Sequence, residues 1–422
     1  MKSKISLLIL CLSLIISACS QKEKTCIING KVINRPLSTQ LILTKSFEDS
    51  RSKSAEIINI KDSAFQFEIN FKYVEAYTLI FNDEHEQGRM RPIIFFTSND
   101  TIKMELYPMN DYEKNVISGG FENKMFSEHK KKEMNETEEK TKVIRDSMQI
   151  LKTNDTYNSQ AMKSLKKKLE NTEIEEEEDK IYVQINELYE SGEALSPVAK
   201  SLRAQYDSII KLINDKELSY IKSNVSIFNY YSLIRTIINT KYSKDFSSFD
   251  ELSMLQKKYA EKYKSHPYTK YSNEVMWRFA NMKPGGNFYD FTLPDTTGTK
   301  YTLSEEIKGK YAFIDIWAPW CGPCIAKSRD MKPVFDSYKD KGFTIVGVAS
   351  KYDEFENVIK LLEKDKYPWK TLIDKPEIDS RINEHYGIEM AGGGCVLVDK
   401  TGKIVLVNPT VEEVKKVLET SL

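Results

Sequence analysis

Hydrophobic and polar residues alternate in short runs through the first quarter of the chain, and each run ends at Asn, Asp, Ser, Gly or Pro. Runs such as AFQFEINF (64–71) and TIKMELY (101–107) place apolar side chains near every second position. This is the period of a β-strand with one buried face. The pattern predicts a small all-β domain over residues 24–116, built as a sandwich or a barrel.

The pattern changes after residue 116, and no proline or glycine occurs between Phe121 and Ser191. Such a segment favours helices, so residues 117–282 are predicted to be an α-helical region. Apolar positions such as Ile181, Val183, Leu212 and Ile213 are expected to form buried stripes in a small bundle. We interpret this bundle as an arm or as a surface for a homodimer. Pro284-Gly285-Gly286 then predicts a linker that permits domain motion.

The last third of the chain contains the strongest chemical signal. The apolar run YAFIDIW (311–317) predicts a buried strand, and the segment after Cys324 favours a helix. Cys321 would therefore lie near a helix N-terminus, where the helix dipole favours a thiolate. This spacing predicts a redox dithiol in which Cys321 attacks a substrate disulfide and Cys324 resolves the mixed disulfide.

A CxxC pair can also bind zinc or form a structural disulfide. A zinc site needs two further ligands, and the sequence offers four histidines and no second CxxC, so no metal and no cofactor is predicted. A structural disulfide across one helical turn would close too small a loop to stabilise much. The sequence therefore favours the redox interpretation over these two alternatives.

The stretch FIDIWAPWCGPCIAKSRDMKPVF (313–335) resembles the active-site region of the thioredoxin superfamily. With FTLPDTTGTKYTLSEEIKGK (291–310), it looks like the TlpA-like exported thiol:disulfide oxidoreductases. The resemblance covers residues 283–422 and implies an α/β domain with a helix broken near Pro333 and a final helix after a capping box at Thr410 and Glu413. Residues 24–116 more weakly resemble the β-domain of unknown function that precedes thioredoxin domains in Gram-negative lipoproteins.

The resemblance implies roles for several residues. Asp315, between two isoleucines, would be a buried acid that takes the proton of Cys324. Trp320 and Pro323 would shape the substrate groove. The family's cis-proline position falls on Gly393, and the glycine loop that includes Gly392 is expected to be trans and mobile.

Two further cysteines are left without an assigned role. Cys395 follows the glycine loop and is either a packing residue or a third redox thiol. Cys26, near the start of the predicted β-domain, has no identifiable partner in the sequence.

The N-terminus resembles a bacterial lipoprotein signal. Lys2 and Lys4 precede an apolar stretch that ends in ISAC (16–19), too short to span a bilayer. Residues 1–18 would be removed and Cys19 lipidated, with ordinary signal cleavage near the same site as the alternative. Ser20 after this cysteine favours the outer membrane, so the expected location is periplasmic and lipid-anchored.

The charge of the chain argues against one class of partner, and the expected function rests on the dithiol. The 62 basic and 62 acidic residues balance, so no nucleic-acid partner is predicted. The expected function is reduction of protein disulfides, which requires a membrane electron-donor thiol protein; cytochrome c maturation is one partner class that the family implies. The alternatives are a peroxiredoxin-type peroxidase, disfavoured by Ala318 where that family has Thr or Ser, and a non-enzymatic ligand-binding lipoprotein with a scaffolding thioredoxin domain.

Overall fold

The computed structural model describes most of the chain after the predicted signal. The described residues are 22–48, 50, 54–88, 91–172, 174–240, 249–349, 355–375, 378, 380, 382–388 and 393–422. Cys19 and Gly392, both singled out in the sequence, lie outside them. Within these ranges, none of the helices combines the length and the apolar character needed to cross a bilayer.

The N-terminal part is a sandwich of two four-stranded sheets with strand orders β4-β1-β7-β8 and β3-β2-β5-β6. The strands are β1 (Lys24–Val32), β2 (Gln40–Lys45), β3 (Glu56–Asn59), β4 (Ala64–Phe71), β5 (Ala76–Phe81), β6 (Ile93–Phe96), β7 (Ile102–Leu106) and β8 (Val116–Ser118), with a short α1 (Asn82–Glu86) and a 3-10 helix (Met109–Lys114). Burial alternates along β1, and Cys26 and Ile28 are fully buried between the sheets. Cys26 is thus a core residue, and its Sγ accepts a hydrogen bond from the Ser98 N–H.

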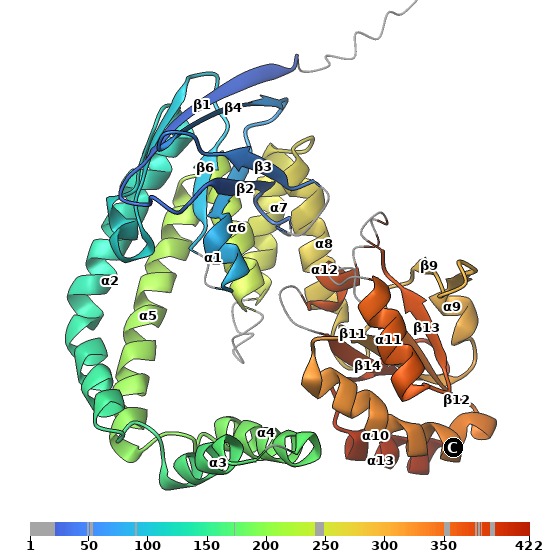
Figure 1. The fold of residues 1–422 in the computed structure, drawn as a ribbon. Coiled ribbons are helices and arrows are strands. Elements are labelled where there is room, and N and C mark those ends of the chain that lie inside the picture. The colour runs from blue at the N-terminus through green and yellow to red at the C-terminus, as the bar shows by residue number, and fades with distance from the viewer. Residues whose placement is uncertain are drawn as a thin grey trace, which may run out of the picture.

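The helical region separates into an arm and a layer that covers the sandwich (Figure 1). Its helices are α2 (Phe121–Thr153), α3 (Gln160–Glu170), α4 (Glu175–Glu190), α5 (Pro197–Ser223), α6 (Ile227–Thr240), α7 (Phe249–Lys262) and α8 (Pro267–Asn281). The long α2 and α5 lie side by side, and the α3–α4 pair at their far end reaches α10 of the C-terminal domain.

The helical layer shares its core with the β-domain, so the prediction of one small bundle is wrong. Ala76 of β5 and Phe96 of β6 pack with Tyr230 and Tyr268 from α6 and α8. The backbone N–H of Ala76, at the start of β5, also donates a hydrogen bond of 2.5 Å to the hydroxyl oxygen of Tyr268. The sheet surface therefore supplies the apolar partner that a separate bundle would otherwise need.

The C-terminal domain is a five-stranded sheet of order β13-β12-β11-β14-β15 with helices around it. Its elements are β9 (Thr292–Pro294), β10 (Lys300–Thr302), α9 (Leu303–Glu306), β11 (Tyr311–Trp317), α10 (Gly322–Tyr338), a 3-10 turn (Lys339–Lys341), β12 (Phe343–Ala349), α11 (Phe355–Asp365), β13 (Lys370–Ile373), α12 (Ile382–Tyr386), β14 (Gly394–Val398), β15 (Ile404–Val407) and α13 (Val411–Ser421). The central strand β11 pairs parallel with β12 and antiparallel with β14.

Two local expectations for this domain are corrected. Helix α10 is continuous through Pro333, because Met331 and Val334 on either side of it pack into one core. The segment after α8 is hydrogen-bonded to β15: the Gly285 N–H donates to the Ile404 carbonyl, and the Ile404 N–H donates to the Gly286 carbonyl. These bonds fix the predicted linker to the domain that it was expected to release.

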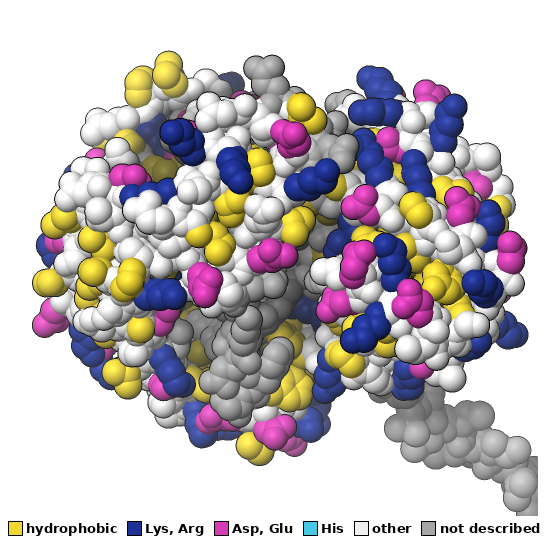
Figure 2. Space-filling model, turned by 90° about the horizontal axis from the view of Figure 1, so that it is seen from below, with side chains coloured by type: hydrophobic (Ala, Val, Ile, Leu, Met, Phe, Trp, Pro, Cys, Tyr) yellow, Lys and Arg dark blue, Asp and Glu magenta, His cyan; other side chains and the backbone are white. Residues whose placement is uncertain are grey.

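Acidic and basic side chains are mixed on the face of the molecule seen from below. Figure 2 shows lysine and arginine side chains interspersed with aspartate and glutamate, and apolar side chains scattered among them. This distribution agrees with the equal numbers of acidic and basic residues in the chain.

Candidate active site

The dithiol lies where the central strand turns into helix α10. Strand β11 ends at Trp317, and a tight turn follows in which the Cys321 N–H donates to the Ala318 carbonyl. Cys321 occupies the cap position, and Pro323 lies in the first turn of a helix that begins at Gly322. Proline fits there because the first helical N–H groups lack intrahelical partners. The Cys321 and Cys324 sulfurs form a disulfide, with Cα atoms 5.3 Å apart.

Asp315 lies on β11, the strand that leads into the dithiol, and Ser328 links it to Cys324. It is 3% exposed, and its Oδ2 accepts a 2.5 Å hydrogen bond from the Ser328 hydroxyl, which also donates to the Cys324 carbonyl at 3.1 Å. Burial raises the pKa of Asp315 to about 6, against the opposing effects of the Ser328 hydrogen bond and the Lys327 charge. A carboxyl group with this pKa exchanges protons near neutral pH, as general acid–base chemistry requires.

The two residues expected to shape the groove, Trp320 and Pro323, are both exposed. Trp320 is 53% exposed beside the disulfide, so it is not a core residue and is free to contact a substrate. Pro323 is also exposed.

Gly393, the first residue of the glycine loop that the structure describes, lies close to the site. A Cβ at Gly393 would lie 2.1 Å from the Ile316 carbonyl oxygen and 3.0 Å from the Cys324 Sγ. Only glycine fits this approach without movement of the backbone, so the position expected to hold proline faces the resolving cysteine without a side chain. The mobility of the loop stays a prediction, since Gly392 lies outside the described residues.

The structure adds two site residues that were not predicted. Ser328 bonds Asp315, and the Lys327 Nζ lies 3.6 Å from the sulfur of Cys395. Cys395 is buried, and burial raises its pKa to about 11, which favours packing over thiolate chemistry. Helical spacing gives a signal for both residues, because positions three and four after Cys324 lie on the same face of α10.

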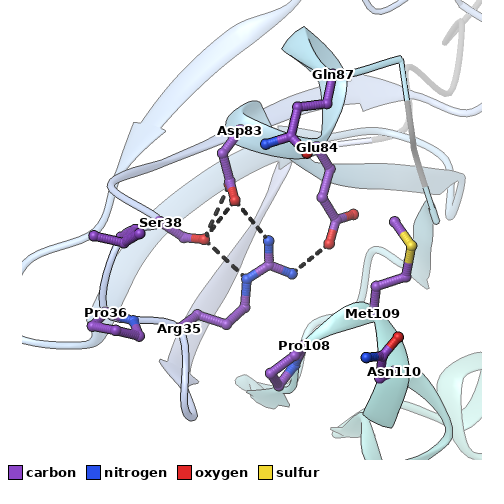
Figure 3. A pocket seen from close by; sticks show the side chains of 10 residues that line it. Arg35, Pro36, Ser38, Asp83, Glu84, Gln87, Pro108, Met109 and Asn110 are labelled. Atoms are coloured by element: carbon purple, nitrogen blue, oxygen red, sulfur yellow. Dashed lines mark hydrogen bonds and ion pairs between the residues drawn. The ribbon is translucent and has the colours of Figure 1, made fainter.

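A second polar site lies in the β-domain, around a cavity of about 380 Å³ next to Arg35. Figure 3 shows the Arg35 guanidinium between Asp83 and Glu84, with Ser38 hydrogen-bonded to Asp83. The guanidinium also stacks 3.4 Å from the centre of the Phe81 ring. These contacts connect the β1–β2 loop to α1, and we interpret the cluster as a structural connection.

Comparison with known proteins places the C-terminal domain in a functional context. Residues 283–422 match the Redoxin family. Thiol-disulfide oxidoreductase ResA of Bacillus thuringiensis is 31% identical over 127 residues, which are 29% of this chain and 68% of that protein. ResA of Geobacillus thermodenitrificans is 28% identical over 156 residues, or 36% of this chain and 86% of that protein.

A solved structure is similar over the same part of the chain. The thioredoxin domain of a thiol-disulfide oxidoreductase from Bacteroides vulgatus is 28% identical, with a TM-score of 0.30, and the match covers 33% of this chain and 96% of that one.

Proposed function

The chain belongs to the thiol-disulfide oxidoreductases related to ResA, and from this premise we propose that it reduces disulfide bonds in other proteins through Cys321 and Cys324. The observation that carries the proposal is the Cys321–Cys324 disulfide at the start of α10, which Ser328 links to the buried carboxyl group of Asp315. The Gly-Pro pair between the cysteines, which is typical of reducing thioredoxins, supports the reductive direction.

The reaction proceeds through a mixed disulfide. The Cys321 thiolate attacks a substrate disulfide and releases one substrate sulfur as a thiolate. Cys324 then attacks the Cys321 sulfur, and Asp315, ionised above its pKa of about 6, accepts the Cys324 proton. The second substrate sulfur leaves, and the Cys321–Cys324 disulfide remains. A thiol protein must then return two electrons to this pair, and a membrane donor fits an anchored enzyme.

We also propose that this activity takes place outside the cytoplasm. A lipid on Cys19 would hold the protein to a membrane, with the outer membrane preferred. The apolar segment that ends in ISAC supports this part of the proposal. Labelling of cells with a radioactive fatty acid tests it: the label is expected in the wild-type protein and absent from Cys19→Ser. Label in the variant would contradict the anchor at Cys19.

Insulin reduction with dithiothreitol as electron donor tests the activity. The wild-type protein is expected to accelerate insulin precipitation, and Cys321→Ser to abolish the acceleration, because the attacking sulfur is gone. Cys324→Ser is expected to trap the mixed disulfide, detected as a species that thiols release. Peroxide consumption without insulin reduction would indicate the peroxidase alternative. The absence of both activities would favour a scaffolding domain.

A further inference from the structure

Lys327 brings a positive charge into the layer between α10 and the sheet. It lies three residues after Cys324 and is partly buried, and its ammonium group donates to the Cys395 sulfur at 3.6 Å. A lysine on the surface of a helix normally keeps its ammonium in water. Here the side chain instead turns toward the sheet, where it reaches Cys395 of β14.

The pairing of β11 and β14 puts this ammonium near the buried acid. Asp315 and Cys395 are direct partners in the antiparallel register, and such partners have Cβ atoms about 5 Å apart on one face of the sheet. Ser328, the residue after Lys327, donates to Asp315 from the same turn of α10. Three elements therefore bring the Asp315 carboxyl, the Lys327 ammonium and the Cys395 thiol together.

Other groups around Asp315 leave Lys327 as its main source of positive charge. From α10, the Ser328 hydroxyl donates to Asp315, and from β12, Gly347 pairs with Asp315 without a side chain. Tyr367, before β13, feels the Asp315 charge, but its hydroxyl donates to Asp365 at 2.9 Å.

The next cation on α10 is already engaged elsewhere. The guanidinium of Arg329 pairs with Asp365 at 2.9 Å. Its charge is therefore directed toward Asp365, away from the carboxyl of Asp315.

On the basis of the proposed function, we propose that Lys327 is a positioning residue of the redox site, whose ammonium keeps the Asp315 carboxylate ionised and ready to accept the Cys324 proton. In this step the Cys324 sulfur bonds to the Cys321 sulfur, and the bond between Cys321 and the substrate breaks. The substrate sulfur leaves with the electron pair, and the proton moves to Asp315. Lys327 exchanges no atom; it acts through Asp315.

The test compares full-length wild-type protein with Lys327→Met and Lys327→Arg over pH 5 to 8. The readouts are the rate of insulin reduction and the equilibrium of the Cys321–Cys324 pair with dithiothreitol. Loss of the cation is expected to move the acid limb of the rate profile, and the break in the equilibrium profile, to higher pH by about 1 unit. Lys327→Arg keeps the charge and is expected to retain the wild-type profiles.

Lys339→Met is the matched control, because it removes a cation from the 3-10 turn that directly follows α10, where Lys339 pairs with Asp336. Its profiles are expected to match the wild type. Coincident profiles for Lys327→Met and wild type, in protein with native near-ultraviolet circular dichroism, would overturn the proposal. Should Lys327→Met fail to fold, Lys327→Gln is measured in its place against the same criterion.

The two readouts separate this proposal from the proposed function. If wild-type protein fails to reduce insulin at every pH, the proposed function fails. The dithiothreitol equilibrium needs no protein substrate, so a moved break in that profile would still support the role of Lys327, and an unmoved break would reject it.

Discussion

At the scale of single residues, the buried acid should make the stability of the domain depend on pH. The pKa of Asp315 is raised from 3.8 to about 6 in the folded protein, so folding favours the protonated form. Stability is then fully present below about pH 4 and is lost as pH rises through 6. Relative to Asp315→Asn, which never ionises, the wild type is expected to lose about 2 kcal/mol of unfolding free energy between pH 4 and 7.

Urea unfolding at the two pH values, followed by tryptophan fluorescence, measures this difference. Most of the signal reports on the C-terminal domain, since three of the four tryptophans, Trp317, Trp320 and Trp369, lie in it, whereas Trp277 lies in α8. Equal stability differences at pH 4 and pH 7 would show that Asp315 titrates as it does in water.

Gly393 gives a second prediction at this scale. Gly393→Ala puts a Cβ 2.1 Å from a backbone oxygen, so the loop must move, and we expect a loss of about 1–3 kcal/mol with slower disulfide exchange. Gly322→Ala is the control, because a Cβ there meets nothing within 4 Å. The same urea titration compares both variants, and equal stability of the two would contradict the close approach.

At the scale of elements, the sequence pattern predicts long helices and strands and helices whose capping residues are close in sequence. The strands of the β-domain have the predicted alternation, and Thr410 and Glu413 form the capping box that their spacing indicates. The three-residue β8 and the five-residue α12 were not predicted, because they are too short to show a period.

The predicted apolar stripes of the helical region hold only in part. Ile181 and Ile213 are buried, whereas Val183 and Leu212 are 58% and 60% exposed. The reason is that α4 and α5 belong to a slender arm, where each helix has few neighbours to cover its apolar residues (Figure 1). Sequence period predicts that a helix has an apolar face but not how much of that face finds a partner.

The site divides in the same way. One strand–turn–helix pattern was enough to predict Cys321 and Cys324, and the resemblance to the thioredoxin superfamily added Asp315, six residues before Cys321. The Lys327–Cys395 contact and the approach of Gly393 to Cys324 depend on the pairing of β11 with β14. That pairing joins segments about eighty residues apart, and short-range pattern carries no information about such contacts.

At the scale of the whole molecule, the C-terminal domain is held to the helical layer by α8 and α12. Arg278 of α8 is 2% exposed, and its Nη1 donates to the Glu384 carbonyl of α12 at 2.8 Å. Beside it, the ring of His385 stacks on Tyr289 with centres 3.6 Å apart and meets the edge of Trp277. Together with the hydrogen-bonded linker, these contacts predict that the domain is docked in a fixed orientation.

Arg278→Met tests this docking, because it leaves the Glu384 carbonyl without its charged donor, at a cost of about 1.5–3 kcal/mol. Hydrogen exchange is expected to quicken at the Gly285 and Ile404 amides, whose bonds hold the linker to β15. The dithiothreitol equilibrium should stay unchanged, since α8 contributes nothing to the dithiol.

Arg203→Met on the exposed face of α5, where Arg203 pairs with Asp207 one turn away, is the control and should leave exchange at both amides as in wild type. Faster exchange confined to Arg278→Met would mean that the docking contacts, and not the Pro-Gly-Gly sequence, decide how freely the redox domain moves. Unchanged exchange in both variants would contradict the role of Arg278. The bonds between the linker and β15 would then fix the linker without it.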